Sequence, residues 1–462
     1  MRKAVRDILW LLAALPTLCM AQNVTTGSLP PPLVTVNSVE TCLNSRYSQH
    51  TLSRAAASAQ QIANILWAAG RMPVTGTYRR IYVATPSGTY LYDPNDHSLS
   101  RHSNEVVSEG GFAILYETQG DFDAGVLFMP AMLAAVSLGR STEAAVASCP
   151  KGLGFPQTRL FFGVQPVTNP TTSLAAHCSI APDQPGWLPD PSMAGDDSLE
   201  TVLANLRYTN RLARTNLTLQ ETSQILWAGY GCTAHMTTNA RAGLTVPSAF
   251  ANYYLSGSIY LVNEDGIRRY QNRTPGLSPG TRDHRLEALA PPVQGRQPRS
   301  EEGGGAPQPA EARTALRKAV RRLPEAPCYI VLCLDSSAAG QHYAQLETGF
   351  VAANDLMQAT ALGLGCYFTP GLTSSEQQAV RAATGIPATH VPQVIVSVGV
   401  AAMPGDADGN DTVDLADYAI LSRCWLRSKS QVGYDARADF DGDGLVNLAD
   451  LSLLAANWLR TR

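Results

Sequence analysis

The chain has 462 residues, of which 45% are hydrophobic and 16% are charged, with a formal net charge of −3 at pH 7 and a pI of about 6.3. This balance lacks the strongly basic character typical of nucleic-acid binding, so we expect no nucleic-acid partner. The interval from 40 to 400 is long enough for about two domains.

The N-terminus has the pattern of an export signal. Three basic residues precede an apolar run over residues 8–18, and Ala21 offers a small residue for cleavage. This order predicts a Sec-type signal peptide over residues 1–21, and the apolar run is too short to span a bilayer. We therefore expect a secreted or cell-surface-associated protein without a membrane span.

The cysteine content is compatible with an oxidising compartment. Without Cys19, which lies in the predicted signal peptide, eight cysteines remain, and this even number permits disulfides. Cys328 and Cys333 flank an apolar run, and their odd separation predicts side chains on opposite faces of one strand.

Two parts of the interval from 40 to 400 are similar to each other. Three pairs of segments match in the same order, which predicts an internal duplication: 62–70 with 222–230, 88–93 with 265–270, and 123–139 with 347–363.

Each copy has the same predicted elements. An amphipathic helix ends at Trp67 or Trp227, and two strands and a long Ala-rich helix follow. The strands are predicted at 79–85 and 112–117 in the first copy and at 258–263, 328–335 and 394–400 in the second; the long helices are predicted at 124–138 and 347–362.

This mixture of helices and strands predicts an α+β fold with antiparallel strands under helices. We expect a first domain over 40–164, a linker over 165–196, and a second domain over 197–400. A Pro- and Gly-rich stretch at 290–312 predicts a disordered insertion in the second domain.

The second copy carries three motifs in a recognisable order: RYTNR at 207–211, TVPSA at 245–249, and GFVAANDLMQATALGLGCYF at 349–368. Their order resembles that of nitroreductase-like flavoproteins, and most closely the peptide-azoline dehydrogenase branch of that family. The resemblance implies two such domains packed as a pair with FMN at their interface. The chain would then be a fused pseudo-dimer in which the first copy is degenerate.

The resemblance also implies cofactor-binding residues. Arg207, Thr209 and Arg211 would approach the phosphate, ribityl chain and pyrimidine edge of FMN. Guanidinium groups suit this role because they bind phosphate bidentately and stabilise negative charge on a reduced flavin. The other implied positions are a loop, a backbone donor and the first-copy counterparts: Pro247, Ser248, Ala249, Gly371, Arg46, Ser48 and His50.

An FMN-dependent oxidoreductase is the leading function that the resemblance implies, although three departures keep a second function open. Phe250 occupies a position where the family usually has Gly, and the first copy lacks the loop equivalent to 245–249. Pro370, which has no N–H, occupies the position of the donor to flavin N5, and Gly371 would replace it as the donor only if the loop shifts. The alternative is a non-catalytic binding or structural protein on a decayed flavoprotein scaffold, within an extracellular polysaccharide-degrading assembly. A carbohydrate-active enzyme is a third class, but no paired-carboxylate motif supports it.

Near the C-terminus, two acid-rich segments share one spacing. Oxygen-bearing side chains recur at positions 1, 3, 5, 9 and 12 of each, and position 7 would add a backbone carbonyl, as in loops that bind calcium. The predicted ligands of two calcium ions are Asp406, Asp408, Asn410, Thr412, Asp414 and Asp417 in the first loop, and Asp439, Asp441, Asp443, Leu445, Asn447 and Asp450 in the second.

Position 6 of these loops requires positive φ, and it is Gly444 in the second loop but Asp411 in the first. Each loop leads into an amphipathic helix, and position 12 is Asp rather than the usual EF-hand Glu. This duplicated unit, residues 405–462, resembles the type I dockerin, a small all-α, EF-hand-like module. The resemblance implies that the partner is a cohesin domain of a scaffold or cell-surface protein.

Overall fold

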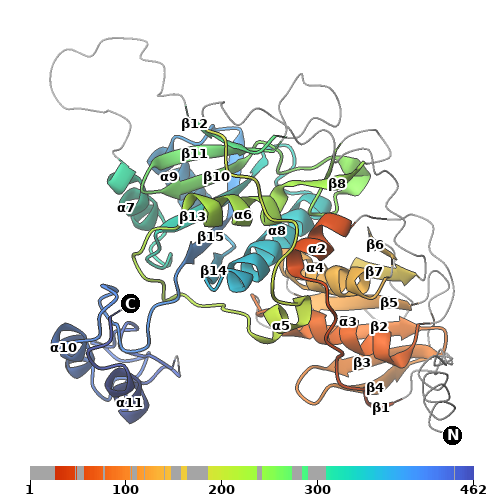
Figure 1. Cartoon of the computed structure of the whole chain (residues 1–462), viewed down its shortest axis with the longest axis horizontal. Helices are drawn as coiled ribbons and strands as arrows, with labels where there is room; N and C mark the ends of the chain where they lie inside the picture. The colour runs from red at the N-terminus through yellow and green to blue at the C-terminus, as the bar shows by residue number, and fades with distance from the viewer. Residues whose placement is uncertain are drawn as a thin grey trace, which may run out of the picture.

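The structure is a computed structural model. It describes residues 26–46, 48, 57–75, 79–104, 106, 112–118, 120–139, 141–146, 158–163, 186–236, 242–272, 283–289, 309–441 and 443–461. The predicted signal peptide, His50, and most of the predicted linker and insertion lie outside these residues. The described residues form a first unit (26–163), a second unit (186–400) and a C-terminal module (404–461) (Figure 1).

The first unit is built on a seven-stranded sheet with the order β1-β4-β3-β2-β5-β7-β6. All its strand pairs are antiparallel. Its elements are β1 (Gly27–Ser28), α2 (Val39–Ser45), α3 (Ala59–Arg71), β2 (Arg79–Thr85), β3 (Gly88–Asp93), β4 (Ser98–Ser103), β5 (Phe112–Thr118), α4 (Asp121–Ser137), β6 (Ser141–Val146) and β7 (Thr158–Gly163).

The second unit is built on a six-stranded antiparallel sheet with the order β12-β11-β10-β13-β15-β14. A separate hairpin, β8-β9, precedes it in the chain. The elements are α5 (Leu199–Ala204), α6 (Leu219–Tyr230), β8 (Cys232–Met236), β9 (Ala242–Leu244), the 3₁₀ helix η2 (Ala249–Ala251), β10 (Ile259–Asn263), β11 (Gly266–Gln271), β12 (Arg285–Ala288), α7 (Pro309–Ala319), β13 (Cys328–Asp335), α8 (His342–Ala361), β14 (Gly365–Thr369), α9 (Ser374–Thr384) and β15 (His390–Gly399).

The elements of the two units correspond in the order that the repeated segments predict. Helix α3 corresponds to α6, the hairpin β2-β3 to β10-β11, strand β5 to β13, and helix α4 to α8. The predicted α+β class and the antiparallel strands are confirmed. In β13 the alternation of side chains places Cys328 in the core beneath α8 and Cys333 in a second core on the opposite face, as predicted. Six cysteines in the described part of the chain are buried.

The last residues of the predicted linker, 186–196, form hydrogen bonds to the rest of the second unit. Leu188 donates its backbone N–H to His284 (3.1 Å), and the side chain of Gln224 accepts the N–H of Ser192 at 2.7 Å. Gly195 reaches the first unit, where its N–H donates to Ser38 Oγ at 2.9 Å. The chain from 186 to 197 therefore contacts both units.

The two units meet where α4 crosses α8. A Cβ added to Gly125 would lie 2.2 Å from the carbonyl oxygen of Leu346, and one added to Gly349 would lie 2.2 Å from that of Phe122. Side chains larger than hydrogen are therefore excluded at the crossing, and the backbones of the helices pack directly against each other. This contact joins the units into one buried core.

The close crossing of α4 and α8 predicts that a methyl group added at Gly349 destabilises the fold. Gly349→Ala is expected to lower the free energy of unfolding by about 1–3 kcal/mol, because the backbone of α4 must move away from the added Cβ. Gly340→Ala is the matched control, since a Cβ there meets nothing within 4 Å. Urea denaturation measures both variants, and equal midpoints for the two would contradict the close crossing.

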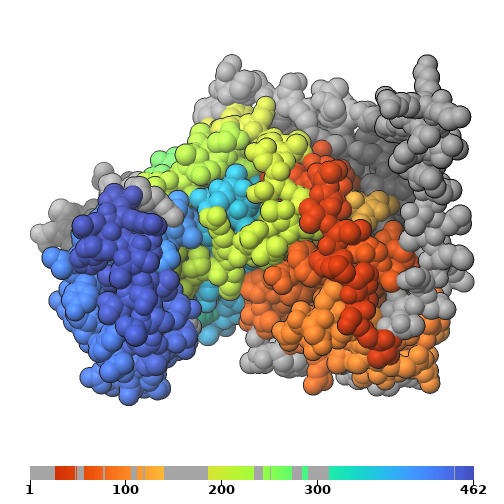
Figure 2. Space-filling model, turned by 60° about the horizontal axis from the view of Figure 1, so that its bottom comes forward, coloured from red at the N-terminus to blue at the C-terminus, as the bar shows by residue number. Residues whose placement is uncertain are grey.

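The C-terminal module packs two short helices, α10 (Leu415–Arg423) and α11 (Leu448–Ala456), around a small core. That core contains Val413, Leu421, Cys424, Ala438, Val446 and Leu454. The module lies beside the second unit (Figure 2). In the part of the chain that the structure describes, no helix is long and apolar enough to cross a membrane.

Candidate functional site

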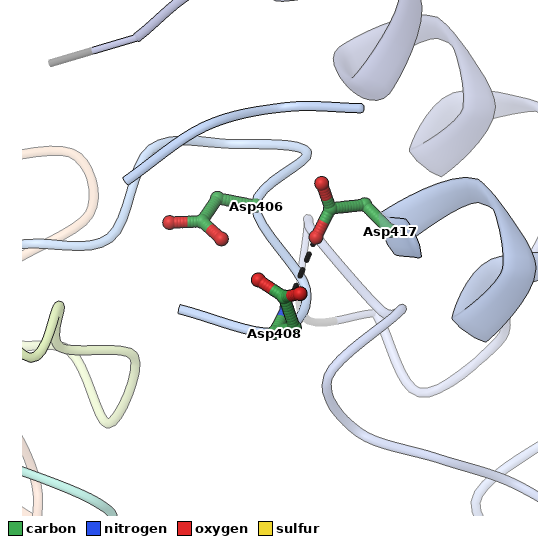
Figure 3. Close-up of side chains that lie close together, drawn as sticks. All are labelled: Asp406, Asp408 and Asp417. Carbon is green, nitrogen blue, oxygen red and sulfur yellow. Dashed lines mark hydrogen bonds between the residues drawn. The ribbon is translucent and has the colours of Figure 1, made fainter. Parts of the chain in front are cut away.

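The first acidic loop brings three predicted calcium ligands together. One carboxylate oxygen from each of Asp406, Asp408 and Asp417 lies within 4.8 Å of the others, and Figure 3 shows the three side chains grouped where the loop meets α10. Backbone N–H groups fix them, because Gly409 donates to Asp406 at 2.8 Å and Ala407 to Asp417 at 2.6 Å. Asp417 is fully buried, and burial raises the pKa of Asp406.

The second loop repeats the arrangement with a different trio. Carboxylate oxygens of Asp439, Asp441 and Asp443 lie within 4.8 Å of one another. Asp450 is fully buried at the start of α11 and accepts the N–H of Asn447 at 2.8 Å. Two clusters of carboxylates match the hard oxygen ligands that calcium prefers, so the residues fit the predicted ions.

The remaining predicted ligands have other tasks in this structure. Asp414 and Asn447, at position 9, cap α10 and α11 by accepting N–H groups from Ala416 (2.7 Å) and Ala449 (2.6 Å). In EF-hand loops, position 9 often binds calcium through water, so a capping role is compatible with the loop. At position 5 of the first loop, Asn410 accepts the N–H of Thr412, and at position 7 Thr412 and Leu445 form isolated β-bridges with Thr461 and Ser428.

A second group of predicted residues meets between the two units. Arg46 follows α2 in the first unit, is 1% exposed, and donates to the carbonyl oxygens of Thr245 (3.1 Å) and Leu244 (3.0 Å) in the second unit. Burial lowers the pKa of Arg46 to about 10. The Nη1 atom of Arg46 and the hydroxyl of Thr245 are buried without a hydrogen-bond partner among the described residues.

The loop after Thr245 has an unusual backbone. Pro247, Ser248 and Ala249 lead into a segment where two non-glycine residues, Ala251 and Tyr253, have positive φ of 53° and 51°. The N–H of Tyr253 donates to Ser248 Oγ at 2.7 Å, which ties the segment back on itself. Conformations of this kind are costly and are often found where a ligand is held. The side chain of Phe250 lies outside the described residues, and Ser48 is exposed.

Beneath this loop lies Glu347 of α8, which sequence analysis did not predict. It is 1% exposed and accepts hydrogen bonds from the hydroxyl of Tyr230 and the N–H of Leu255. Burial raises the pKa of Glu347 to about 7. The local sequence gives no signal for this residue, because its partners lie 117 and 92 positions away.

The raised pKa of Glu347 predicts a pH-dependent stability. Because the folded pKa lies above the unfolded value of 4.5, the stabilisation is fully present below that value and is lost as pH rises through about 7. The expected loss is of order 3 kcal/mol at most. Glu347→Gln should remove this part of the pH profile in thermal unfolding. A profile identical to wild type would contradict the assignment.

The motif at 207–211 is located elsewhere, beside β14. The N–H of Thr209 donates to Cys366 at 2.9 Å, and Arg207 donates from its side chain to the carbonyl of Gly363. Gly371 follows β14 with φ of +64° and open space around it. The carbonyls of Pro370 and Gly371 accept hydrogen bonds from Arg322 at 3.0 and 3.1 Å. The partners of these residues are therefore β14, the turn at Gly363 and Arg322.

Arg211, the last residue of this motif, points to the C-terminal module. Its guanidinium donates to the carbonyl oxygens of Arg437 (3.0 Å), Asp406 (3.2 Å) and Asp439 (3.3 Å). It also lies over the ring of Phe440, 4.4 Å from the centroid. Both guanidinium groups that were predicted to contact FMN at this position, those of Arg207 and Arg211, thus donate to backbone carbonyls.

Comparison with known families agrees with this architecture. Residues 207–400 match the nitroreductase family, and residues 404–457 match the dockerin type I domain. The chain therefore contains a nitroreductase-family domain followed by a type I dockerin domain, which we call the dockerin from here on. A type I dockerin implies attachment to a cohesin in an extracellular assembly of the cellulosome type. No curated protein matches the sequence closely enough to be counted as a relative.

Solved structures extend the likeness over most of the chain. A nitroreductase structure from Anabaena variabilis matches with a TM-score of 0.53 and 13% identity, covering 83% of this chain and 96% of that one. A second, from Ralstonia eutropha, has a TM-score of 0.34 and 18% identity over 47% of this chain and 89% of that one. A third, from Desulfovibrio desulfuricans in complex with FMN, has a TM-score of 0.27 and 15% identity over 44% and 84%. The first establishes a nitroreductase-like fold over most of the chain.

Proposed function

We propose that this chain is a secreted FMN-dependent oxidoreductase of the nitroreductase type, anchored to a cohesin by its calcium-loaded dockerin. It is a tandem pseudo-dimer with a degenerate first domain, and it holds one flavin between the two domains. The observation that supports the flavin site is the pairing of Arg46 with the 245–249 loop. There, a buried guanidinium nitrogen of Arg46 and the hydroxyl of Thr245 have no hydrogen-bond partner within the described part of the chain. Burying a donor without a partner costs free energy, and a bound ligand with several acceptors would remove this cost.

The residues around Arg46 fit an anionic cofactor. The guanidinium would bind the phosphate or the pyrimidine edge of FMN, and the hydroxyls of Thr245 and Ser248 would add hydrogen bonds. When bound, FMN supplies hydride acceptance at N5. The burial of Arg46 strengthens its interaction with an anion because little water competes. Glu347 holds Leu255 and Tyr230 beneath the loop and so positions the segment that faces the cofactor.

The opposite position, at 207–211, supports the second candidate function. There Arg207 and Arg211 are bonded to backbone carbonyls, and Pro370 cannot donate an N–H to flavin N5. If the position at Arg46 were also unable to bind FMN, the chain would be a non-catalytic binding or structural protein on a decayed flavoprotein scaffold. Assignment to the peptide-azoline dehydrogenase branch is part of the proposal and rests on the sequence motifs alone.

FMN titration, followed by quenching of flavin fluorescence, tests the proposal. We expect Arg46→Gln to weaken binding by about 1.5–3 kcal/mol, the worth of a hydrogen bond to a charged group, which is about 10- to 150-fold in Kd. Arg207→Gln is the control, and we expect it to change the Kd by less than about threefold. Circular dichroism must show that both variants are folded. Equal effects of the two substitutions would contradict the site at Arg46, and no binding to wild type would favour the scaffold function.

A further inference from the structure

One arginine makes three hydrogen bonds between the second unit and the dockerin. The side chain of Arg211 donates to the carbonyl oxygens of Asp406 and Asp439, which are position 1 of the first and second calcium loops. A third hydrogen bond goes to the carbonyl of Arg437, and the guanidinium stacks on Phe440. A single side chain of the nitroreductase-family domain therefore contacts both calcium loops at once.

The second observation is a difference between two loops that are otherwise near copies. At position 6 the second loop has Gly444 with φ of 85°, while the first has Asp411 with φ of 66°. A non-glycine residue is strained in this region. The carboxylate of Asp411, however, accepts a hydrogen bond from the hydroxyl of Thr215 in the second unit. The residue that departs from glycine is thus the one that reaches across the contact.

From these contacts we infer that Arg211 and Thr215 form a docking site for the calcium-loop face of the dockerin, which holds the module in one fixed orientation on the nitroreductase-family domain. The partner is the calcium-loaded form of this chain's own dockerin. The acceptors are backbone carbonyls and a residue with positive φ, and they are held in place only when both loops are folded. The inference rests on calcium binding by the loops and is independent of the flavin proposal.

The docked orientation leaves the cohesin-facing helices free. Leu415 and Leu448, the first residues of α10 and α11, are 72% and 67% exposed. Docking therefore fixes the direction in which a cohesin-bound chain presents its nitroreductase-family domain, and it does not hide either helix. The docking site also occupies the guanidinium of Arg211, which in this arrangement cannot reach a flavin.

The contacts come from individual side chains, so single substitutions can test them. A cavity of about 250 Å³ lies beside Arg211, and residues of both partners line it, among them Tyr367 and Asp408. Arg214 lines the same cavity, but it pairs with Glu325 of its own unit at 3.1 Å. Arg214→Ala therefore removes an equal charge from the same place without removing a dockerin contact, and it serves as the matched control.

Small-angle X-ray scattering of the full chain in calcium is the test. We expect Arg211→Ala to increase the radius of gyration and the maximum dimension by several ångströms, Asp411→Gly to do so to a smaller extent, and Arg214→Ala to scatter like wild type. Asp411→Gly introduces the usual residue of position 6, so we expect this variant to fold. Calorimetry should show two calcium ions bound in every variant. The inference is overturned if Arg211→Ala stays as compact as wild type, if Arg214→Ala expands equally, or if wild type in calcium is already as extended as Arg211→Ala.

Discussion

Removal of calcium is expected to unfold the dockerin while the rest of the chain stays folded. Its core holds six buried residues, two of them a Cys and an Ala, which is too small to offset the repulsion between carboxylates packed within 4.8 Å. At a calcium concentration roughly 100 times the Kd, each ion would contribute about 2.7 kcal/mol to the folded state. The free energy lost on removal of both ions should therefore exceed the free energy of unfolding of the module.

Hydrogen exchange of the full chain measures this effect. In chelator, the amides of 404–461 should lose protection, while those of β13 and α8 should keep it. Asp450→Asn should lower calcium binding because its carboxylate is fully buried at position 12 of the second loop. Asp435→Asn, which removes a charge outside both loops, should not. Equal protection of the dockerin with and without calcium would contradict its dependence on the metal.

Loss of cohesin binding is expected only when both dockerin helices are changed. Leu415-Ala416 and Leu448-Ala449 open the two helices in equivalent positions and are all exposed, so either pair can face the partner. Replacing one pair with charged residues should weaken binding about twofold, the statistical loss of one of two modes. Replacing both should weaken it by more than about 100-fold.

Calorimetric titration with a type I cohesin would compare the two single-pair variants and the combined one. The matched control is a charged substitution at Val432, which is 96% exposed and lies in the segment of the chain that connects α10 and α11. Complete loss of binding from either single-pair variant would show that the two surfaces are not interchangeable.

Much of the fold could be read from sequence because its signals are local. The two acidic clusters were predictable because each set of predicted ligands lies within twelve residues. Strands β2, β5, β10, β13 and β15 were predictable because each is a short apolar run bounded by turns. Helix limits were less certain. Helix α8 begins at His342, five residues before the predicted start at 347. Helix α9 was missed, although the capping box of Thr373 and Glu376 is a readable signal.

The positions of the site residues could not be read in the same way. Arg46 contacts carbonyls 198 and 199 positions away, and Arg211 contacts carbonyls 195 to 228 positions away. Backbone carbonyls carry no side-chain identity, so no sequence pattern marks them as acceptors. The one local sign of the docking contact is Asp411, whose departure from glycine is visible in the sequence but whose partner, Thr215, is not.

The number of flavins bound per chain tests the central claim most directly. Saturation with FMN, removal of free flavin, and absorbance at about 450 nm give the stoichiometry from the protein concentration. The proposed site between Arg46 and the 245–249 loop, together with the engagement of Arg207 and Arg211 by protein carbonyls, predicts one flavin per chain. Two flavins would show that the position at 207–211 is also functional, and none would contradict the oxidoreductase proposal.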